Sequence, residues 1–332
     1  MKASGSSVAI LGAAIALFVS LTSPALAAGG DLDPTFGSGG MLTTSLSNGR
    51  DFAAGIAVQA DDRVVAVGRS GGANPKFGIA RYDVDGTLDS TFGGGDGIVK
   101  TDFSPASDLA IATAIQSDGK IVVVGAVRAD RPDRRWGVAR YLADGTPDAS
   151  FGLDGRVNTN LTPLGDTPYG VAIQADGKVV VAGGSDRGGP NPNFAVVRYN
   201  ADGTLDPTFG GDGIVTTDVQ TDQPDAAFGG VRIQSDGKIV TAGYSGYQPE
   251  FALARYESDG SLDASFGGGW HGHRDLPPSR SEGIHSLLHL GPLDGDPARR
   301  QDRGGRCRPH HRYVRMYRSR GCPCSLRSRW LP

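Results

Sequence analysis

The sequence predicts an all-β fold, specifically a β-propeller built from four-stranded repeats of about 58 residues. The 332 residues include 51 glycines and only 7% aromatics, a composition typical of many short strands and turns. A phenylalanine in segments such as "DGTLDPTFGGDGIVTT" recurs at spacings of 56, 59, 58 and 57 residues. These phenylalanines are Phe36, Phe92, Phe151, Phe209 and Phe266. The chain is therefore internally periodic.

Two further landmarks recur in the same order within each repeat. Segments such as "AIQSDGKIVVVG" place a glutamine at Gln59, Gln116, Gln174 and Gln234. Segments such as "FALARY" end at Tyr82, Tyr141, Tyr199 and Tyr256. The repeats therefore span about residues 29–82, 83–141, 142–199 and 200–256, and a fifth begins at 257–269.

Each repeat has the pattern of four strands. In the second repeat these are Gly97 to Phe103, Ala110 to Gln116, Lys120 to Gly125 and Trp136 to Tyr141, which are apolar, β-branched and bounded by Gly, Asp or Pro. Ser117-Asp118-Gly119 joins the second strand to the third, and Asp-Gly is a strong hairpin signal because both residue types tolerate positive φ. One such meander buries too little apolar surface alone, so copies pack radially as a propeller or linearly as a stack. Radial packing suits a four-stranded unit better.

The recurring "DGTLDPTFGGDGIVTT", "IQSDGKIVVVG" and "FALARY" resemble the delta-60 repeat, a bacterial β-propeller repeat. The resemblance covers about residues 29–269. It implies propeller blades on exported or surface proteins of unassigned biochemical function, and it implies no catalytic residues.

Residues 1–27 have the features of a secretory signal peptide. Lys2 precedes an apolar stretch from Val8 to Leu21, and Ala25-Leu26-Ala27 forms a small-residue cleavage site. The apolar stretch is short for a membrane span, which disfavours the alternative of an uncleaved anchor. We expect cleavage after Ala27, a mature chain without a transmembrane segment, and a secreted, periplasmic or cell-surface location in a bacterium.

The last 63 residues, 270–332, differ in composition from the repeats. Residues 28–266 carry a net charge of −12, whereas residues 267–332 carry +8 and contain every histidine and cysteine of the chain. Shifted by one base, the codons of Gly295 to Pro309 permit "AIQPDGKIVVVGAV", which differs at one position from "AIQSDGKIVVVGAV" at Ala114 to Val127. We therefore expect residues 270–332 to be an out-of-frame, disordered extension of an interrupted fifth repeat.

The alternative for this segment is a basic interaction tail. Its arginines lack the aromatic residues or heptads of a nucleic-acid-binding module, so no nucleic-acid partner is expected. Cys322, Cys324, His310 and His311 do not have the spacing of a zinc site.

Catalytic residues are few in the repeats. Residues 28–266 hold no histidine or cysteine, which excludes a histidine-dependent nucleophile or a histidine-bound metal in that region. The turn Asp83-Val84-Asp85-Gly86 resembles a calcium loop. However, its first position becomes Leu142 in the next repeat, so a turn-forming role is favoured and no cofactor is expected beyond calcium at one or two repeats. The recurring Arg81, Arg140, Arg198 and Arg255 are expected to pair with a nearby aspartate, and Leu88, Phe92, Leu205 and Phe209 to pack between blades.

The loops between the third and fourth predicted strands vary most, and such loops commonly bind ligands. Arg128, Arg131, Arg134 and Arg135 form a basic patch there, and Tyr244 and Tyr247 are candidates to contact a sugar or peptide. Solvated loops without function are the alternative.

These observations predict an exported, non-catalytic binding or scaffolding protein whose partner is an extracellular protein or a carbohydrate. One alternative is a carboxylate-dependent, carbohydrate-active enzyme such as a glycoside hydrolase or lyase. Another is a non-functional truncation product, because an incomplete ring leaves strand edges that invite aggregation.

Overall fold

The computed structural model describes residues 30–185, 191–221 and 223–268, and these residues form short strands joined by turns. The expected signal peptide at 1–27, the rest of the fifth repeat and the segment 270–332 lie outside the described residues. The strands are β1 (Phe52–Val58), β2 (Val64–Ser70), β3 (Lys76–Tyr82), β4 (Ile98–Thr101), β5 (Leu109–Ile115), β6 (Ile121–Val127), β7 (Arg135–Tyr141), β8 (Arg156–Thr159), β9 (Asp166–Ile173), β10 (Val179–Ser185), β11 (Asn193–Tyr199), β12 (Ile214–Thr217), β13 (Asp225–Ala226), β14 (Val231–Ile233), β15 (Ile239–Ser245) and β16 (Glu250–Tyr256). The single helical turn in this part of the chain is η1 (Phe266–Gly268).

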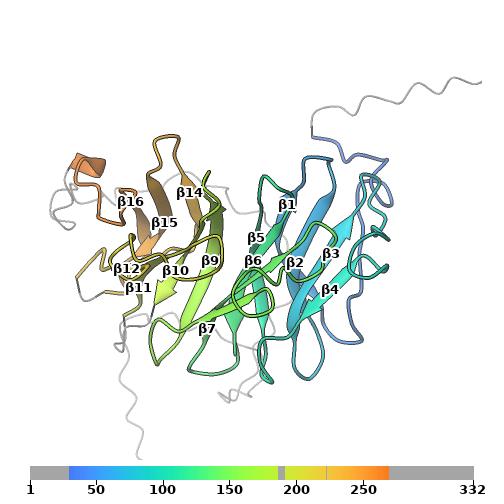
Figure 1. The fold of residues 1–332 in the computed structure, drawn as a ribbon, viewed down its shortest axis with the longest axis horizontal. Coiled ribbons are helices and arrows are strands. Elements are labelled where there is room, and N and C mark those ends of the chain that lie inside the picture. The colour runs from blue at the N-terminus through green and yellow to red at the C-terminus, as the bar shows by residue number, and fades with distance from the viewer. Residues whose placement is uncertain (1–29, 186–190, 222, 269–332) are drawn as a thin grey trace, which may run out of the picture. The chain divides into compact units, whose positions relative to one another are not determined.

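The strands form four antiparallel sheets, which we number as blades 1 to 4 (Figure 1). Blades 1, 2 and 3 are the meanders β1-β2-β3-β4, β5-β6-β7-β8 and β9-β10-β11-β12. In blade 4, β13 and β14 share the place of the first strand beside β15, and β16 pairs with the other edge of β15. The predictions of an all-β fold and of four-stranded antiparallel meanders are confirmed.

The blades are offset from the sequence repeats by one strand. β4 pairs with β3, so Gly97 to Phe103, expected as the first strand of the second repeat, completes blade 1 instead. The chain reverses after Tyr82, which bridges to Leu88, and the N–H of Arg81 then donates to the carbonyl of Gly97 at 2.9 Å. Blades 1, 2 and 3 therefore take their fourth strands from the following repeat.

The expected hairpin at Ser117-Asp118-Gly119 is present, with one difference. The N–H of Gly119 donates to the carbonyl of Gln116 at 2.9 Å, and that of Gln116 to the carbonyl of Lys120 at 2.8 Å. Gly119 has positive φ, 82°, whereas Asp118, the other residue of the Asp-Gly pair, does not. This three-residue loop is a type I turn closed by a left-handed residue, a geometry that requires glycine at one position only.

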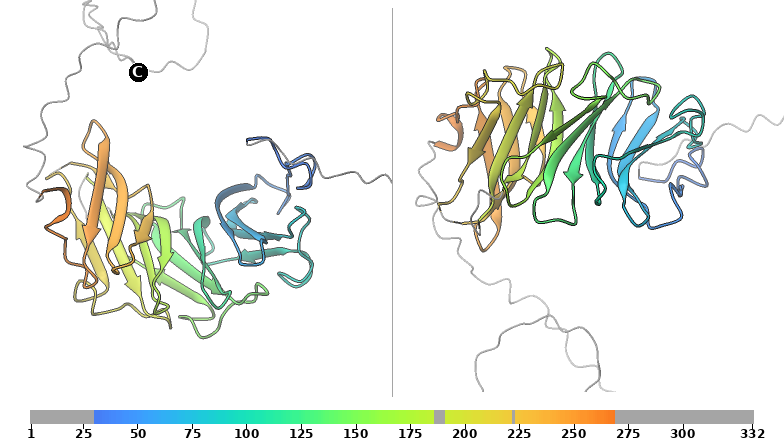
Figure 2. Two further views of the ribbon diagram at one scale, coloured as in Figure 1. Left: turned by 90° about the horizontal axis from the view of Figure 1, so that it is seen from above. Right: turned by 60° about the horizontal axis from the view of Figure 1, so that its bottom comes forward.

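The hydrophobic core lies between consecutive blades rather than within one. In each of the three contacts, the forward face of one blade packs on the rear face of the next blade along the chain. Between blades 1 and 2, for example, Phe77 and Ile79 of the forward face meet Ile121, Val123 and Tyr141 of the rear face. Figure 2 shows the four sheets following one another in chain order, with blades 1 and 4 at the two ends of the row. Each blade is therefore stabilised mainly by its neighbours.

The described residues include no helix of a length and hydropathy suited to crossing a membrane.

Candidate functional site

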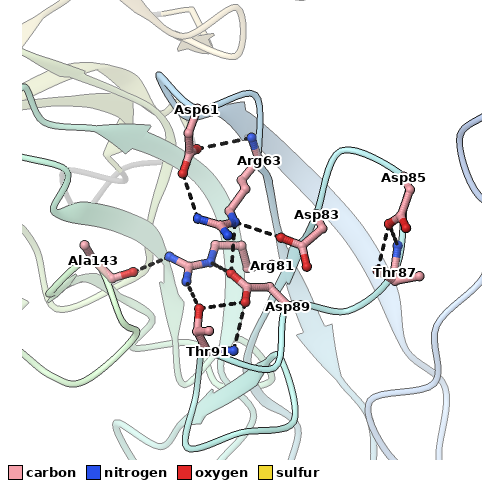
Figure 3. A network of polar contacts seen from close by, with 9 residues as sticks. All are labelled: Asp61, Arg63, Arg81, Asp83, Asp85, Thr87, Asp89, Thr91 and Ala143. Atoms are coloured by element: carbon pink, nitrogen blue, oxygen red, sulfur yellow. Dashed lines mark hydrogen bonds and ion pairs between the residues drawn. The ribbon is translucent and has the colours of Figure 1, made fainter.

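The recurring arginines form a buried polar junction between consecutive blades. In the first junction, Arg81 Nε lies 2.7 Å from Asp89 Oδ2, and its Nη2 donates to Thr91 Oγ1 at 3.1 Å (Figure 3). Arg81 Nη1 donates across to the carbonyl of Ala143 in the next blade's turn, and the guanidinium lies 4.6 Å from the centroid of the Phe92 ring. Arg81 thus takes part in an ion pair, a cation–π contact and a hydrogen bond between blades.

The same junction is built twice more. Arg140 contacts Asp148 at 2.8 Å and the carbonyl of Ala201 at 2.6 Å. Arg198 contacts Asp206 at 2.7 Å and the carbonyl of Ser258 at 2.5 Å. The expected pairing of these arginines with a nearby aspartate is confirmed, and it also holds for Arg255, which contacts Asp263 at 2.7 Å.

The aspartates of the junctions are held in the ionised form. Burial raises the pKa of Asp206, but the hydrogen bonds from Thr208 and the charge of Arg198 outweigh it and lower the pKa to about 2. Burial also opposes ionisation of Asp89 and Asp148, and the same kinds of contact again give a lowered pKa. These carboxylates therefore act as structural ion-pair partners.

The expected packing role of the leucine and phenylalanine pairs is confirmed for both phenylalanines and for Leu205, which packs against the core between blades 2 and 3. Phe92 and Phe209 are fully buried, whereas Leu88 and Leu205 are half-buried. The buried rings lie under the guanidinium groups of Arg81 and Arg198, at 4.6 and 4.7 Å from ring centroid to guanidinium carbon.

The candidate calcium turn has its carboxylates engaged within the protein. Asp85 Oδ1 accepts hydrogen bonds from the N–H and hydroxyl of Thr87 at 2.9 and 2.7 Å, and Asp83 Oδ1 accepts from Arg63 Nε at 2.8 Å (Figure 3). No group of three or more His, Cys, Asp or Glu residues suited to a metal occurs among residues 30–185, 191–221 and 223–268. The contacts of Asp85 are those of a turn-forming aspartate.

The predicted basic patch is partly neutralised. Arg128 Nη1 lies 3.0 Å from Asp133, and Arg131 Nε lies 3.9 Å from Asp130. Nε of Arg134 and of Arg135 is buried without a hydrogen-bond partner among the described residues, so these side chains lie against the protein. The four arginines therefore do not form one exposed cationic surface.

The two candidate tyrosines have different surroundings. Tyr247 is 67% exposed in the loop after β15, and its hydroxyl donates to Asn191 Oδ1 at 3.0 Å. Tyr244, in β15, stacks on Phe228, with ring centroids 5.3 Å apart and planes at 18°. The structure therefore assigns Tyr244 to an aromatic cluster that the sequence did not indicate.

The aromatic cluster consists of Tyr169, Phe228 and Tyr244. The rings of Tyr169 and Phe228 meet edge to face, with centroids 4.1 Å apart and planes at 64°. Phe228 is 49% exposed, and both tyrosines are half-buried. Rings fixed by one another and still accessible are suited to bind the apolar face of a flat ligand such as a sugar ring.

The fold brings this cluster together from the first strand of blade 3, from the segment between β13 and β14, and from β15 of blade 4. Tyr169 belongs to β9, Phe228 lies between β13 and β14, and β9 contacts both β14 and β5. Tyr169 is skipped in the pairing of β9 with β10, as Ile111 and Ala54 are skipped in blades 2 and 1. Such bulges orient one side chain away from the regular pleat. In the sequence, Tyr169 and Phe228 share one position, three residues after the aspartates Asp166 and Asp225, and this shared position was the available signal for them.

Comparison with known families agrees with this architecture. Four segments match the family described as "Domain of unknown function (DUF5122) beta-propeller", at residues 59–92, 116–151, 174–209 and 234–266. The chain is a β-propeller repeat protein. The four matches follow the repeats that resemble the delta-60 repeat, which confirms both the resemblance and the predicted fold class.

Similar solved structures include propeller chains of several kinds. One is a gluconolactonase from Xanthomonas campestris, with 18% identity, a TM-score of 0.39, and coverage of 64% of this chain and 60% of that one. A catalytically inactive virginiamycin B lyase from Staphylococcus aureus, solved with quinupristin, has 14% identity, a TM-score of 0.36 and coverage of 64% and 58%. An α-L-arabinanase from Cellvibrio cellulosa, complexed with arabinohexaose, has 12% identity, a TM-score of 0.35 and coverage of 64% and 77%. The repeat protein thus spans about three fifths of the length of the first two, and no curated protein matches its sequence.

Proposed function

We propose that this repeat protein is an exported, non-catalytic binding protein, and that the aromatic cluster of Tyr169, Phe228 and Tyr244 is its ligand platform. The observation that carries the proposal is the accessible cluster of three rings, each in contact with the next, that two neighbouring blades contribute. The ligand class that suits it is a neutral carbohydrate, whose rings offer C–H groups to aromatic faces and hydroxyls to nearby polar groups.

A non-catalytic role is supported by what the recurring carboxylates do. Asp89, Asp148 and Asp206 are committed to arginine junctions, with depressed pKa values. A general acid in glycoside hydrolysis instead needs a raised pKa beside a second carboxylate. Burial does raise the pKa of Asp108, but this carboxylate accepts the N–H groups of Phe103, Ser104 and Arg128 and so fixes a loop.

The test is binding of the purified full chain to a panel of soluble neutral polysaccharides, namely arabinan, xylan and mixed-linkage β-glucan, by affinity electrophoresis. We expect retardation by at least one of them, and we expect Tyr244→Ala and Tyr169→Ala to weaken it at least tenfold. Tyr247→Ala is the matched control, because this tyrosine is exposed outside the cluster. Retardation that Tyr247→Ala abolishes and Tyr244→Ala leaves intact would place the ligand elsewhere, and hydrolysis of the polysaccharide would favour the enzyme.

Export is the second part of the proposal, and it is supported by the signal-like residues 1–27. Expression of the full chain in a bacterial host, followed by N-terminal sequencing of the secreted or periplasmic protein, is expected to give a mature chain beginning at Ala28. The reading frame after Gly268 is tested separately by sequencing the gene at that codon.

A further inference from the structure

Within the described residues, the forward face of blade 4 has no neighbouring blade. Phe251 in β16 is 100% exposed and Leu253 is 43% exposed. At the position of Phe251, the other blades carry Phe77, Trp136 and Phe194, all with no exposed surface. The equivalent residues of the other blades are buried by the next blade, so an exposed phenylalanine here indicates a face suited to contact another protein surface.

The rear face of blade 1 is the complementary uncovered surface. Ile56 and Val58 in β1 are 67% and 60% exposed, whereas Val171, which corresponds to Ile56 in blade 3, is 7% exposed. Next to Ile56 lies a groove of about 410 Å³, lined among others by Leu46, Val64, Ala66 and Ala80. In blade 2, the corresponding residues Phe103, Ile121, Val123 and Ala139 surround the ring of Phe77. The groove is therefore shaped to receive an aromatic ring from a preceding blade.

A segment that corresponds in sequence to the fourth strands already lies beside this groove, although it forms no strand itself. Met41–Thr44 corresponds to β4, β8 and β12, and Thr44 Oγ1 accepts a hydrogen bond from Tyr82 at 2.9 Å, as Thr101 contacts Tyr141 at 2.5 Å and Thr159 contacts Tyr199 at 2.7 Å. Conversely, β16 is the one third strand of the four blades that pairs with no fourth strand within the described residues. Within the described residues, blade 4 has no fourth strand, whereas Met41–Thr44 beside blade 1 corresponds to one and pairs with no third strand.

The two ends do not meet within one chain, because Phe251, Ile56 and Val58 would then be covered. We propose that two copies of the chain associate head to tail, with Met41–Thr44 of one copy pairing with β16 of the other. By the register of β3 with β4, Phe251 would lie opposite Thr44, and Leu253 opposite Leu42. Two such contacts related by a twofold axis close a ring of eight blades, the upper end of the usual propeller range.

The contact between copies requires residues 31–37 of one copy to move, because they and the segment around Phe266 of the other copy would occupy the same place. Phe36 and Phe266 occupy corresponding positions in their repeats, so only one of them fits the junction. Phe266 is held over Arg255 at 4.6 Å, and Asp263 beside it contacts both Arg255 and Lys238 at 2.7 Å. Asp33, the counterpart of Asp263, is exposed, and its carboxylate accepts hydrogen bonds from the N–H and the hydroxyl of Thr35. Residues 31–37 are therefore the part that moves aside.

The first experiment measures the mass of the purified full chain by sedimentation equilibrium across a hundredfold range of concentration. A discrete species of two chains is expected, and Phe251→Asp is expected to raise its dissociation constant at least a hundredfold without changing the circular dichroism of the dilute protein. Leu153→Asp is the matched control, because Leu153 is 76% exposed on a turn outside both faces. A chain that stays monomeric, or that grows into open-ended polymers, overturns the proposal.

The second experiment fixes the register. In a chain with Cys307, Cys322 and Cys324 replaced by serine, Leu42→Cys and Leu253→Cys are introduced together, because directly opposed residues on antiparallel strands lie within disulfide range. A covalent dimer on a non-reducing gel is expected, and Leu153→Cys with Leu253→Cys is expected to give none. A disulfide within a single chain, or equal cross-linking of both pairs, contradicts the arrangement.

Discussion

Blades 3 and 4 carry nearly the same forward face in two different environments. Phe194 and Val196 of blade 3 have no exposed surface, whereas Phe251 and Leu253, at the same positions of blade 4, are 100% and 43% exposed. The repeat sequence therefore encodes a surface that becomes a core only when another blade lies against it. Stability in such a chain is approximately a sum of contacts between neighbours, so identical residues contribute differently at the middle and at the end of the row.

The largest expected difference between the two faces concerns their aromatic rings. Phe194→Ala is expected to lower the free energy of unfolding by about 3–5 kcal/mol, because it removes a buried ring and leaves a cavity. Phe251→Ala is expected to change it by less than about 0.5 kcal/mol in protein dilute enough for copies to be separate. Urea denaturation followed by fluorescence measures both. Equal losses for the two variants would show that the two faces are not different in solution.

The second difference concerns the junction aspartates. Asp206→Asn is expected to cost about 1.5–3 kcal/mol, because it removes the charged acceptor of an arginine side chain that is only 5% exposed. Asp263→Asn is expected to cost less, because Arg255 is 21% exposed and has no further blade to join within the described residues, although Asp263 also pairs with Lys238 at 2.7 Å.

Comparing the native protein with Asp206→Asn also gives a pH dependence of stability. The pKa of Asp206 is lowered to about 2 from an ordinary value of 3.8, so its contribution is fully present above about pH 4 and is lost as the pH falls toward 2. The stability gap between the native protein and Asp206→Asn should therefore narrow over that interval in thermal melts. A constant gap from pH 5 to pH 2 would contradict the role of the carboxylate charge.

The smallest expected difference separates a glycine at a blade junction from one in an exposed turn. Gly203 and Gly237 have nearly the same φ, 87° and 85°. A methyl group at Gly203 would lie 2.8 Å from the backbone nitrogen of Gly152 in the preceding blade, whereas one at Gly237 would meet nothing within 4 Å. Both substitutions place an alanine at positive φ and so share that strain. Gly203→Ala is therefore expected to lower the free energy of unfolding, measured by urea denaturation, by about 1 kcal/mol more than Gly237→Ala. Equal losses of stability would mean that the backbone at Gly152 shifts to accommodate the methyl group without cost.

The architecture was predictable because its determinants are local and repeat. The strands, the turn at Gly119 and the pairing of each recurring arginine with an aspartate eight residues later are all present in a single repeat. The assignment of strands to blades was not predictable, because Gly97 to Phe103 lies between two possible partners along the chain. The path of the turn from Tyr82 to Gly97 decides in favour of β3.

The candidate site was less accessible to sequence reasoning. Tyr244 was identified from its loop, but Tyr169 and Phe228 come from other strands and meet it only through the packing of blades 3 and 4. In the basic patch, Asp133 and Asp130 of the same loop lie beside Arg128 and Arg131 and reduce the local positive charge. Composition alone does not show which charged residues of a loop pair with each other.

The arginine junctions also bear on how such a chain lengthens. Each guanidinium reaches a main-chain carbonyl of the following blade, at Ala143, Ala201 or Ser258, rather than any particular side chain. A duplicated or transplanted blade would thus be accepted without a compensating substitution in its neighbour. Gene segments encoding single blades are consequently free to multiply, be lost or diverge in their loops while the joints between them keep fitting.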